Sequence, residues 1–178
     1  VILGAGIGGM PMAYEMKALA RPGDTVTVIS EAPKFHFVPS NPWVAVDWRS
    51  RKDIEVDIAP ALKRKGIETI IQRAKRVHPD ASQVELEDGN KVDYDYLVIA
   101  TGPKLAFDEV EGLGPHGGHT QSICHVSHAE TSKTAWDSFV QNPGPIVVGA
   151  VQGASCFGPA YEFAMIMDTD LRKRKIRD

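Results

Sequence analysis

The chain has 178 residues, of which 43% are hydrophobic and 24% are charged, a composition typical of a folded globular protein rather than a disordered one. Its 20 basic and 23 acidic side chains give a net charge of -3, which excludes the basic surface that binds DNA or RNA. No apolar run reaches the roughly 20 residues of a membrane helix, and no segment has the pattern of a signal peptide. Two cysteines, Cys124 and Cys156, exclude a disulfide-rich scaffold, and no Cys/His cluster indicates zinc.

The two ends of the sequence lack the usual boundaries of a domain. The first residue is Val1 rather than Met, and it already lies in an apolar segment typical of a buried strand. The last residues, 158–178, have a helical pattern with no capping glycine after it. We therefore expect the chain to be a piece of a longer protein.

The first half of the chain alternates between strand and helix signals. Short apolar or β-branched runs predict strands, and an apolar pattern with helical spacing, with Pro11 in its first turn, predicts the first helix. The predicted strands are 1–3, 25–29, 67–72 and 96–100, and the predicted helices are 9–20 and 57–65. This order is typical of a parallel sheet with helices on its faces.

Other segments interrupt or follow that alternation. Residues 76–92 alternate in hydropathy around Asp88-Gly89-Asn90 and predict a β-hairpin. Residues 32–48 contain three prolines and several aromatic residues; we interpret them as an irregular loop that packs against another part of the protein. The glycine-rich stretch from 105 to 119 predicts a loop. The pattern then predicts a helix at 126–140, a boundary at 142–145, a strand at 146–148 and a helix at 158–178.

A glycine motif joins the first predicted strand to the first helix. Gly4-x-Gly6-x-x-Gly9 permits a tight turn, close approach of a pyrophosphate to the backbone, and close helix packing, while the helix N-terminus offers amide donors to phosphates. Glu31 follows the second strand, roughly 20 residues after the last glycine, where an acidic residue binds the ribose of a dinucleotide. Ser30 is the alternative ribose ligand, and Glu31 is otherwise a solvent-exposed side chain. The motif predicts a dinucleotide site.

A second motif, Ala100-Thr101-Gly102, ends the predicted strand at 96–100. A buried strand with this ending, downstream of an N-terminal glycine motif, resembles the two-dinucleotide-domain flavoproteins of the glutathione-reductase type. In that class the first glycine motif holds FAD, and the Ala-Thr-Gly turn packs beside it.

Four further stretches distinguish one family within that class. They are Val38-Pro39-Ser40-Asn41-Pro42-Trp43, the extension of the Ala-Thr-Gly motif to Phe107, Gln121-Ser122-Ile123-Cys124, and the segment from Gly153 to Glu162, which reads Gly-Ala-Ser-Cys-Phe-Gly-Pro-Ala-Tyr-Glu. Together they resemble sulfide:quinone oxidoreductases, and the resemblance spans essentially the whole chain.

The resemblance implies a fold and a cofactor. It implies a Rossmann-like α/β FAD-binding domain with three layers and an inserted β-hairpin at 1–142, followed by the start of a second dinucleotide-type domain at 143–178. The FAD is expected to be non-covalent, because no cysteine lies between residues 32 and 48, where related flavocytochrome sulfide dehydrogenases attach their flavin. The residues expected to contact FAD are Gly4, Ala5, Gly6, Ile7, Gly8, Gly9, Ser30 or Glu31, Pro39, Ser40, Asn41, Arg73, Thr101 and Gly102.

The resemblance also implies that the cysteines do redox chemistry. Cys156 matches one of the two cysteines beside the flavin, whose partner would lie beyond residue 178, and Cys124 matches a third, assisting cysteine. Cys156 lies where the last predicted helix begins, where backbone amides favour a thiolate; the alternative for either cysteine is a buried, inert thiol. A disulfide between the two is left open, because sequence separation does not determine geometry.

Among the histidines, only His128 is given a role. It lies four residues after Cys124, so the two would share one face if both were helical, and His128 could then carry a proton to or from the thiol. The alternative is an ordinary surface or capping histidine. His116, His119 and His125 are interpreted as loop residues.

The activity implied by the resemblance is oxidation of sulfide with transfer of electrons to a membrane quinone. The family is peripherally attached to the inner membrane of prokaryotes, through a part that this sequence lacks, and the resemblance is compatible with a homo-oligomer. The basic run at 172–177 is interpreted as a solvated helix end.

Two other classes of function remain. The first is a pyridine-nucleotide-linked flavoprotein, such as a type II NADH dehydrogenase or a disulfide reductase. Val151 argues against it, because it occupies the close-approach position of the second turn, 149–154, and a side chain there obstructs a pyrophosphate. The second is a non-catalytic nucleotide-binding module.

Overall fold

The computed structural model describes residues 1–154 and 156–177, and the contacts divide them into two compact units. The first unit contains Val1–His36 and Glu55–Leu105, and the second contains Phe37–Ile54 and the chain from Ala106 onward. Ser155, in the stretch from Gly153 to Glu162, and Asp178, in the last predicted helix, lie outside the described residues.

A parallel four-stranded sheet forms the centre of the first unit, in the order β5-β2-β1-β9. Its strands are β1 (Ile2–Leu3), β2 (Thr27–Ser30), β5 (Glu68–Ile71) and β9 (Val98–Ile99). Ile2 pairs with Val28 on one side and with Val98 on the other. The four predicted strands are therefore confirmed; β1, β5 and β9 are shorter than predicted, and β2 begins and ends later.

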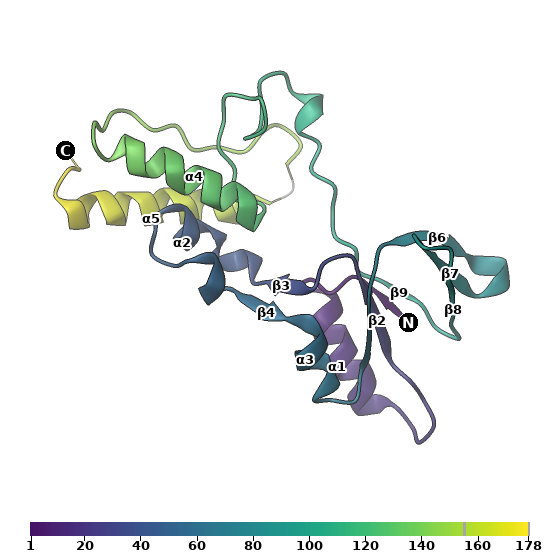
Figure 1. Cartoon of the computed structure of the whole chain (residues 1–178). Helices are drawn as coiled ribbons and strands as arrows, with labels where there is room; N and C mark the ends of the chain where they lie inside the picture. Colours follow the sequence, from purple (N-terminus) through teal and green to yellow (C-terminus); the bar gives the residue numbers. More distant parts are fainter. Residues whose placement is uncertain (155, 178) are drawn as a thin grey trace. The chain divides into compact units, whose positions relative to one another are not determined.

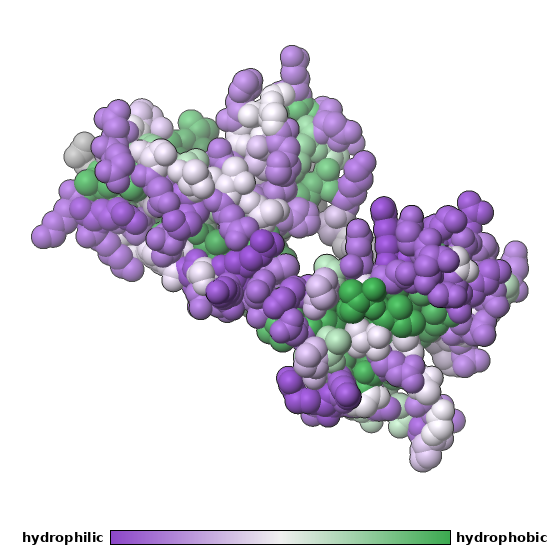
Figure 2. Space-filling view, viewed as in Figure 1, coloured by the Kyte–Doolittle hydropathy of each residue, from purple (hydrophilic) through white to green (hydrophobic). Residues whose placement is uncertain are grey.

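Two layers cover this sheet, because alternate residues of a strand point to opposite faces. Ile2 and Val28 pack against α1 (Gly9–Leu19) and α3 (Ile58–Lys63). Leu3 and Ile29 pack on the other face, against Val84 of an antiparallel sheet made of β6 (Ala74–His78), β7 (Gln83–Leu86) and β8 (Lys91–Asp93). The apolar residues of the parallel sheet are visible between these two more polar layers (Figure 2). The three-layer α/β fold is confirmed.

Two parts of the first unit differ from the sequence-based expectation. The predicted hairpin is β7–β8, but β6 adds a third strand, with a register shift between Ala74 and Arg76. The segment at 32–48 is not wholly irregular, because β3 (Lys34–His36) pairs antiparallel with β4 (Glu55–Asp57). The long separation between β3 and β4 along the chain hides this pairing from local pattern.

The second unit is helical. Its helices are α2 (Asn41–Ala45), α4 (Val126–Phe139) and α5 (Gly158–Arg174), and α4 and α5 lie side by side (Figure 1). Val44 and Ala45 of α2 pack against Val126 and Ala129 of α4. This contact confirms that the apolar segment at 32–48 packs against another part of the chain.

A buried carboxylate ties the helices of the second unit together. Asp170 of α5 accepts hydrogen bonds from Trp48 Nε1 at 2.8 Å, from Trp136 Nε1 at 2.9 Å and from Arg174 Nε at 2.6 Å. Lys173 lies over the Trp48 ring, 4.0 Å from its centroid. Two residues of the basic run at 172–177, Lys173 and Arg174, therefore contact other side chains of the unit.

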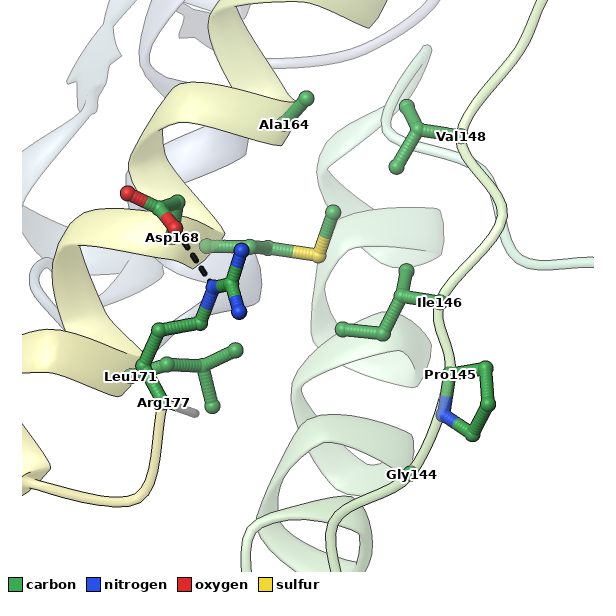
Figure 3. A pocket seen from close by; sticks show the side chains of 9 residues that line it. Gly144, Pro145, Ile146, Val148, Ala164, Asp168, Leu171 and Arg177 are labelled. Carbon is green, nitrogen blue, oxygen red and sulfur yellow. Dashed lines mark hydrogen bonds and ion pairs between the residues drawn. The ribbon is translucent and has the colours of Figure 1, made fainter.

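The strand predicted at 146–148 is wrong. This segment has no regular secondary structure, and Val147 is 97% exposed. Ile146 and Val148 instead point toward α5, across a cavity of about 330 Å³ that Met167, Leu171 and the Asp168–Arg177 ion pair also line (Figure 3). A strand requires a neighbouring backbone for its hydrogen bonds, and no described segment pairs with 146–148. The domain division at residue 142 remains a prediction.

Candidate functional site

The glycine loop of the first unit is packed against the strand end at Ala100. Gly4 has a φ of +96°, and a Cβ at this position would overlap the carbonyl oxygen of Ala100. A Cβ at Gly9 would overlap the carbonyl oxygen of Gly4. These two glycines are therefore required by the packing of the loop, which brings the Ala100-Thr101-Gly102 turn beside it.

Gly6 differs from its neighbours in the same loop. A Cβ at Gly6 would meet nothing within 4 Å, so packing within the chain does not require a glycine there. The space beside it is open at the start of α1, whose N-cap residue, Gly8, has no side chain and whose first turn has no acidic residue. A helix N-terminus of this kind attracts phosphate. The loop fits the pyrophosphate of a dinucleotide such as FAD.

The residues expected at the ribose and adenine lie at the same edge of the parallel sheet. Ser30 ends β2, and its hydroxyl donates to the carbonyl oxygen of Ala32 at 2.9 Å, whereas Glu31 is exposed. Arg73 is also exposed and follows β5, and its carbonyl accepts from the Glu87 amide. Since the Ser30 hydroxyl proton already has an acceptor, Glu31 is the better candidate of the two for a ribose ligand.

Three expected flavin contacts belong to the second unit. Pro39 is exposed, but Ser40 and Asn41 are both 0% exposed. Ser40 Oγ accepts from Arg49 Nη1 at 2.7 Å, and Asn41 Nδ2 donates to the carbonyl oxygen of Ile123 at 2.8 Å. Asn41 Oδ1 is buried and has no hydrogen-bond partner among the described residues. Asn41 thus holds the segment that precedes Cys124 and keeps one acceptor unused.

Both cysteines are exposed free thiols. Cys156 lies two residues before α5, as expected from the sequence. Cys124 lies before α4, which begins at Val126, so the expectation of one helical face shared with His128 is wrong. The Cys124 amide instead donates to Ser122 Oγ at 3.2 Å. Neither thiol is buried in this structure.

His128 is buried, with 5% of its surface exposed, so it is not an ordinary surface histidine, and the cap of α4 is His125. Its Nδ1 lies 3.1 Å from Ser122 Oγ. The rings of His116 and His125 each have their centroids 5.1 Å from that of His128, and Phe107 lies at 5.6 Å. Burial lowers the pKa of His128, and the neighbouring His125 and His116 lower it further. Burial and the two neighbouring histidines therefore both favour the neutral imidazole.

The contacts that surround His128 are not predicted by the sequence. His116 and His125 were interpreted as loop residues, and Ser122 and Phe107 were given no role of their own. The nearest signal was the spacing of Ser122, Cys124 and His128, which places a hydroxyl, a thiol and an imidazole within one short segment. In the part of the chain that the structure describes, no group of three or more His, Cys, Asp or Glu residues is arranged to hold a metal ion.

The fold and the glycine loop together define a dinucleotide-binding α/β protein with exposed thiols. Residues 1–156 match the model of the pyridine nucleotide-disulphide oxidoreductase family. The chain belongs to the pyridine nucleotide-disulphide oxidoreductase family.

The chain is similar to sulfide:quinone oxidoreductases. It is 44% identical to the sulfide-quinone reductase of Aquifex aeolicus over 99% of this chain, and 29% identical to the mitochondrial sulfide:quinone oxidoreductase of Dictyostelium discoideum over 100% of it. The crystal structure of the Aquifex aeolicus sulfide:quinone oxidoreductase matches 99% of this chain with a TM-score of 0.90. In each case the chain spans about 40% of the relative's length.

More distant structures share the fold. The structure of NDH2 from Plasmodium falciparum in complex with NADH matches with a TM-score of 0.61 at 22% identity, covering 79% of this chain and 29% of that one.

None of the helices among the described residues has the length and apolar character needed to cross a membrane.

Proposed function

We propose that the protein carrying this chain oxidises sulfide and passes the electrons through FAD to a quinone. The pair of exposed free thiols, Cys124 and Cys156, carries this proposal. The family membership supports a flavin, and the 44% identity to a sulfide-quinone reductase supports the substrates. The chain on its own would be catalytically incomplete, because the cysteine that pairs with Cys156 and the quinone site would lie outside it.

The glycine loop and the edge of the parallel sheet would hold the FAD without a covalent bond. Amides at 4–9 would bind the pyrophosphate, Glu31 the ribose, and the backbone near Arg73 the adenine. Thr101 and Gly102 are our candidates for flavin contacts in the first unit. The resemblance adds Pro39, Ser40 and Asn41 of the second unit, where Asn41 Oδ1 is an acceptor without a partner among the described residues. Bound there, FAD would supply an acceptor for two electrons.

Cys156 would share a sulfur–sulfur bond with a cysteine outside the described residues. Attack of HS⁻ on this bond would form a persulfide on one cysteine and release the other as a thiolate, so that one S–S bond breaks as another forms. Cys156 is our candidate for the thiol beside the flavin. It is an exposed thiol just before α5, where HS⁻ can reach it.

Cys124 would handle sulfur as the chain on the enzyme grows, and His128 would move the protons that HS⁻ and the thiols exchange. A neutral imidazole can accept a proton at neutral pH, which the lowered pKa of His128 allows. By family resemblance, the intact protein would be a peripheral protein of the prokaryotic inner membrane.

Electron donation by a pyridine nucleotide is the rival function, and the family description supports it in general terms. In this chain the second turn places Val151, which is 39% exposed, where a glycine would be needed for close approach of a pyrophosphate. We therefore propose sulfide rather than NADH as the electron donor.

An anaerobic titration of the intact protein with sulfide tests the proposal. The visible absorption band of the flavin should disappear on addition of sulfide in the wild type, and Cys156→Ser should slow this bleaching by at least about 100-fold, since a covalent step loses its nucleophile. NADH is the control donor and should leave the band unchanged. Bleaching by NADH with no response to sulfide would overturn the proposed donor.

A further inference from the structure

Two side chains hold the backbone just before Cys124. Asn41 of α2 donates to the Ile123 carbonyl at 2.8 Å, and Ser132 of α4 donates to the Ser122 carbonyl, also at 2.8 Å. Both donors are buried. These two hydrogen bonds fix the backbone that carries the Ser122 side chain, and so fix its position beside α4.

The Ser122 hydroxyl makes two contacts at once. Its oxygen accepts the Cys124 amide at 3.2 Å and lies 3.1 Å from His128 Nδ1. A serine hydroxyl has one proton to donate and two lone pairs to accept with. With a lone pair used by the Cys124 amide, its proton has the Nδ1 lone pair as an acceptor within reach.

We propose that Ser122 is a positioning residue, whose hydroxyl donates to His128 Nδ1, fixes the imidazole proton on Nε2, and links this imidazole to the backbone of Cys124. The proposal rests on the proposed function, in which Cys124 handles sulfur and His128 carries protons. It adds the residue that decides which tautomer His128 adopts: Nε2–H is then the group that can donate a proton, and Nδ1, which takes one up, faces the Ser122 hydroxyl.

The charges around His128 determine how strongly the Ser122 hydrogen bond affects its proton affinity. The titratable groups that face it are His125, at the start of α4, and His116, in the preceding loop, and neither offers a negative charge. A hydrogen bond that donates to the neutral ring stabilises the neutral form. Loss of the Ser122 hydroxyl should therefore let His128 take up a proton at higher pH.

The test uses the intact protein with histidine labelled in its ring nitrogens, and His128→Gln assigns the signals. In the wild type, above the pH midpoint of His128, Nδ1 should carry no proton and Nε2 should carry one. In Ser122→Ala, proton affinity at His128 should rise by about 3- to 10-fold, the effect of one hydrogen bond. Ser122→Thr, which keeps the hydroxyl, should restore the wild-type midpoint.

Ser127→Ala is the matched control, because Ser127 is an exposed serine on the same helix, and it should leave the midpoint unchanged. A protonated Nδ1 in the wild type, or an unchanged midpoint in Ser122→Ala, would overturn the proposal.

A second readout follows the thiol. The rate at which iodoacetamide alkylates Cys124, measured on its peptide by mass spectrometry, should show an inflection at the His128 midpoint. In Ser122→Ala the inflection should occur at a higher pH. In His128→Asn it should be absent, and adding Ser122→Ala to that variant should not restore it. A rate without this inflection would overturn the link to Cys124. Neither readout needs sulfide or quinone, so failure of the proposed activity would be seen separately in the flavin titration.

Discussion

The glycine loop of the first unit is built from backbone, whereas the thiol and imidazole cluster of the second is built from side chains carried by separate segments. In the loop, Gly4 and Gly9 leave no room for a single added carbon atom. In the cluster, exposed Cys124 lies beside Ser122, and the buried His128 is surrounded by other rings. A backbone site depends on the absence of side chains, and a side-chain site depends on long-range packing to bring its members together.

The largest effect is expected from Gly9→Ala. Its Cβ would overlap the Gly4 carbonyl oxygen, so the loop must shift, and we expect a loss of roughly 3 kcal/mol in the free energy of unfolding together with loss of bound flavin. Denaturant unfolding followed by circular dichroism and the flavin content of the purified protein measure the two losses.

Gly6→Ala is the matched control, because its Cβ meets only open space. This variant should unfold within about 0.5 kcal/mol of the wild type and still bind less flavin. Equal destabilisation by the two substitutions would remove the distinction between glycines that pack the loop and the glycine that faces the ligand.

Asp170→Asn tests how strongly side-chain packing holds the second unit. The substitution removes the charge that Arg174 pairs with and weakens the acceptors of two buried indoles, so we expect a loss of roughly 2 kcal/mol. Asp168→Asn is the control on the same helix, since Asp168 pairs with Arg172 and Arg177 at the surface, and it should change stability little.

The same carboxylate gives a pH dependence. Burial of Asp170 opposes its ionisation, but hydrogen bonds from Trp48, Arg174 and Trp136 and the charge of Arg174 outweigh it and hold its pKa below the ordinary value. The stability that it contributes is thus complete above the unfolded pKa of about 3.9 and is lost as the pH falls through the lower folded pKa. Thermal unfolding from pH 7 to pH 2 should show less acid sensitivity in Asp170→Asn than in the wild type.

The smallest effect is expected at the surface of the first unit. Hydrogen bonds from His78 and Lys75 lower the pKa of Glu85 to about 2. Its contribution to stability is present above the unfolded pKa of about 4.3 and disappears as the pH approaches 2. Titration of the Glu85 carboxyl by NMR checks the value, and Glu85→Gln should change the melting temperature only slightly, as should Glu87→Gln, the exposed neighbour. A large change from Glu85→Gln alone would contradict this ranking.

The elements that sequence predicted best are those fixed by neighbouring residues. The glycine loop, α1 and the strands of the parallel sheet follow from local spacing, because turn, cap and strand preferences are properties of a short segment. The short helix α2 was hidden by Pro39 and Pro42, although proline is well tolerated in a first helical turn and lies there in α2. The pairing of β3 with β4 joins segments far apart in the chain and has no local signature.

The candidate site follows the same rule. Cys124 and Cys156 were found because thiols are rare in this chain, and the structure adds that both are exposed. The burial of His128 and its contacts with His116, His125 and Ser122 depend on how α4 meets the preceding loop, which no spacing encodes. The segment at 146–148 has the composition of a strand, yet strand formation depends on a neighbour that the described residues do not provide.

The tryptophans around Asp170 make the helical unit visible by fluorescence. All three tryptophans, Trp43, Trp48 and Trp136, belong to the second unit, and two of them donate their indole N–H to this one side chain. Excitation at the long-wavelength edge of protein absorption selects tryptophan over tyrosine. The fluorescence of this chain therefore reports on the helical unit and not on the tyrosines of the first unit. An optical signal can thus follow the loosening of one unit while the other stays folded.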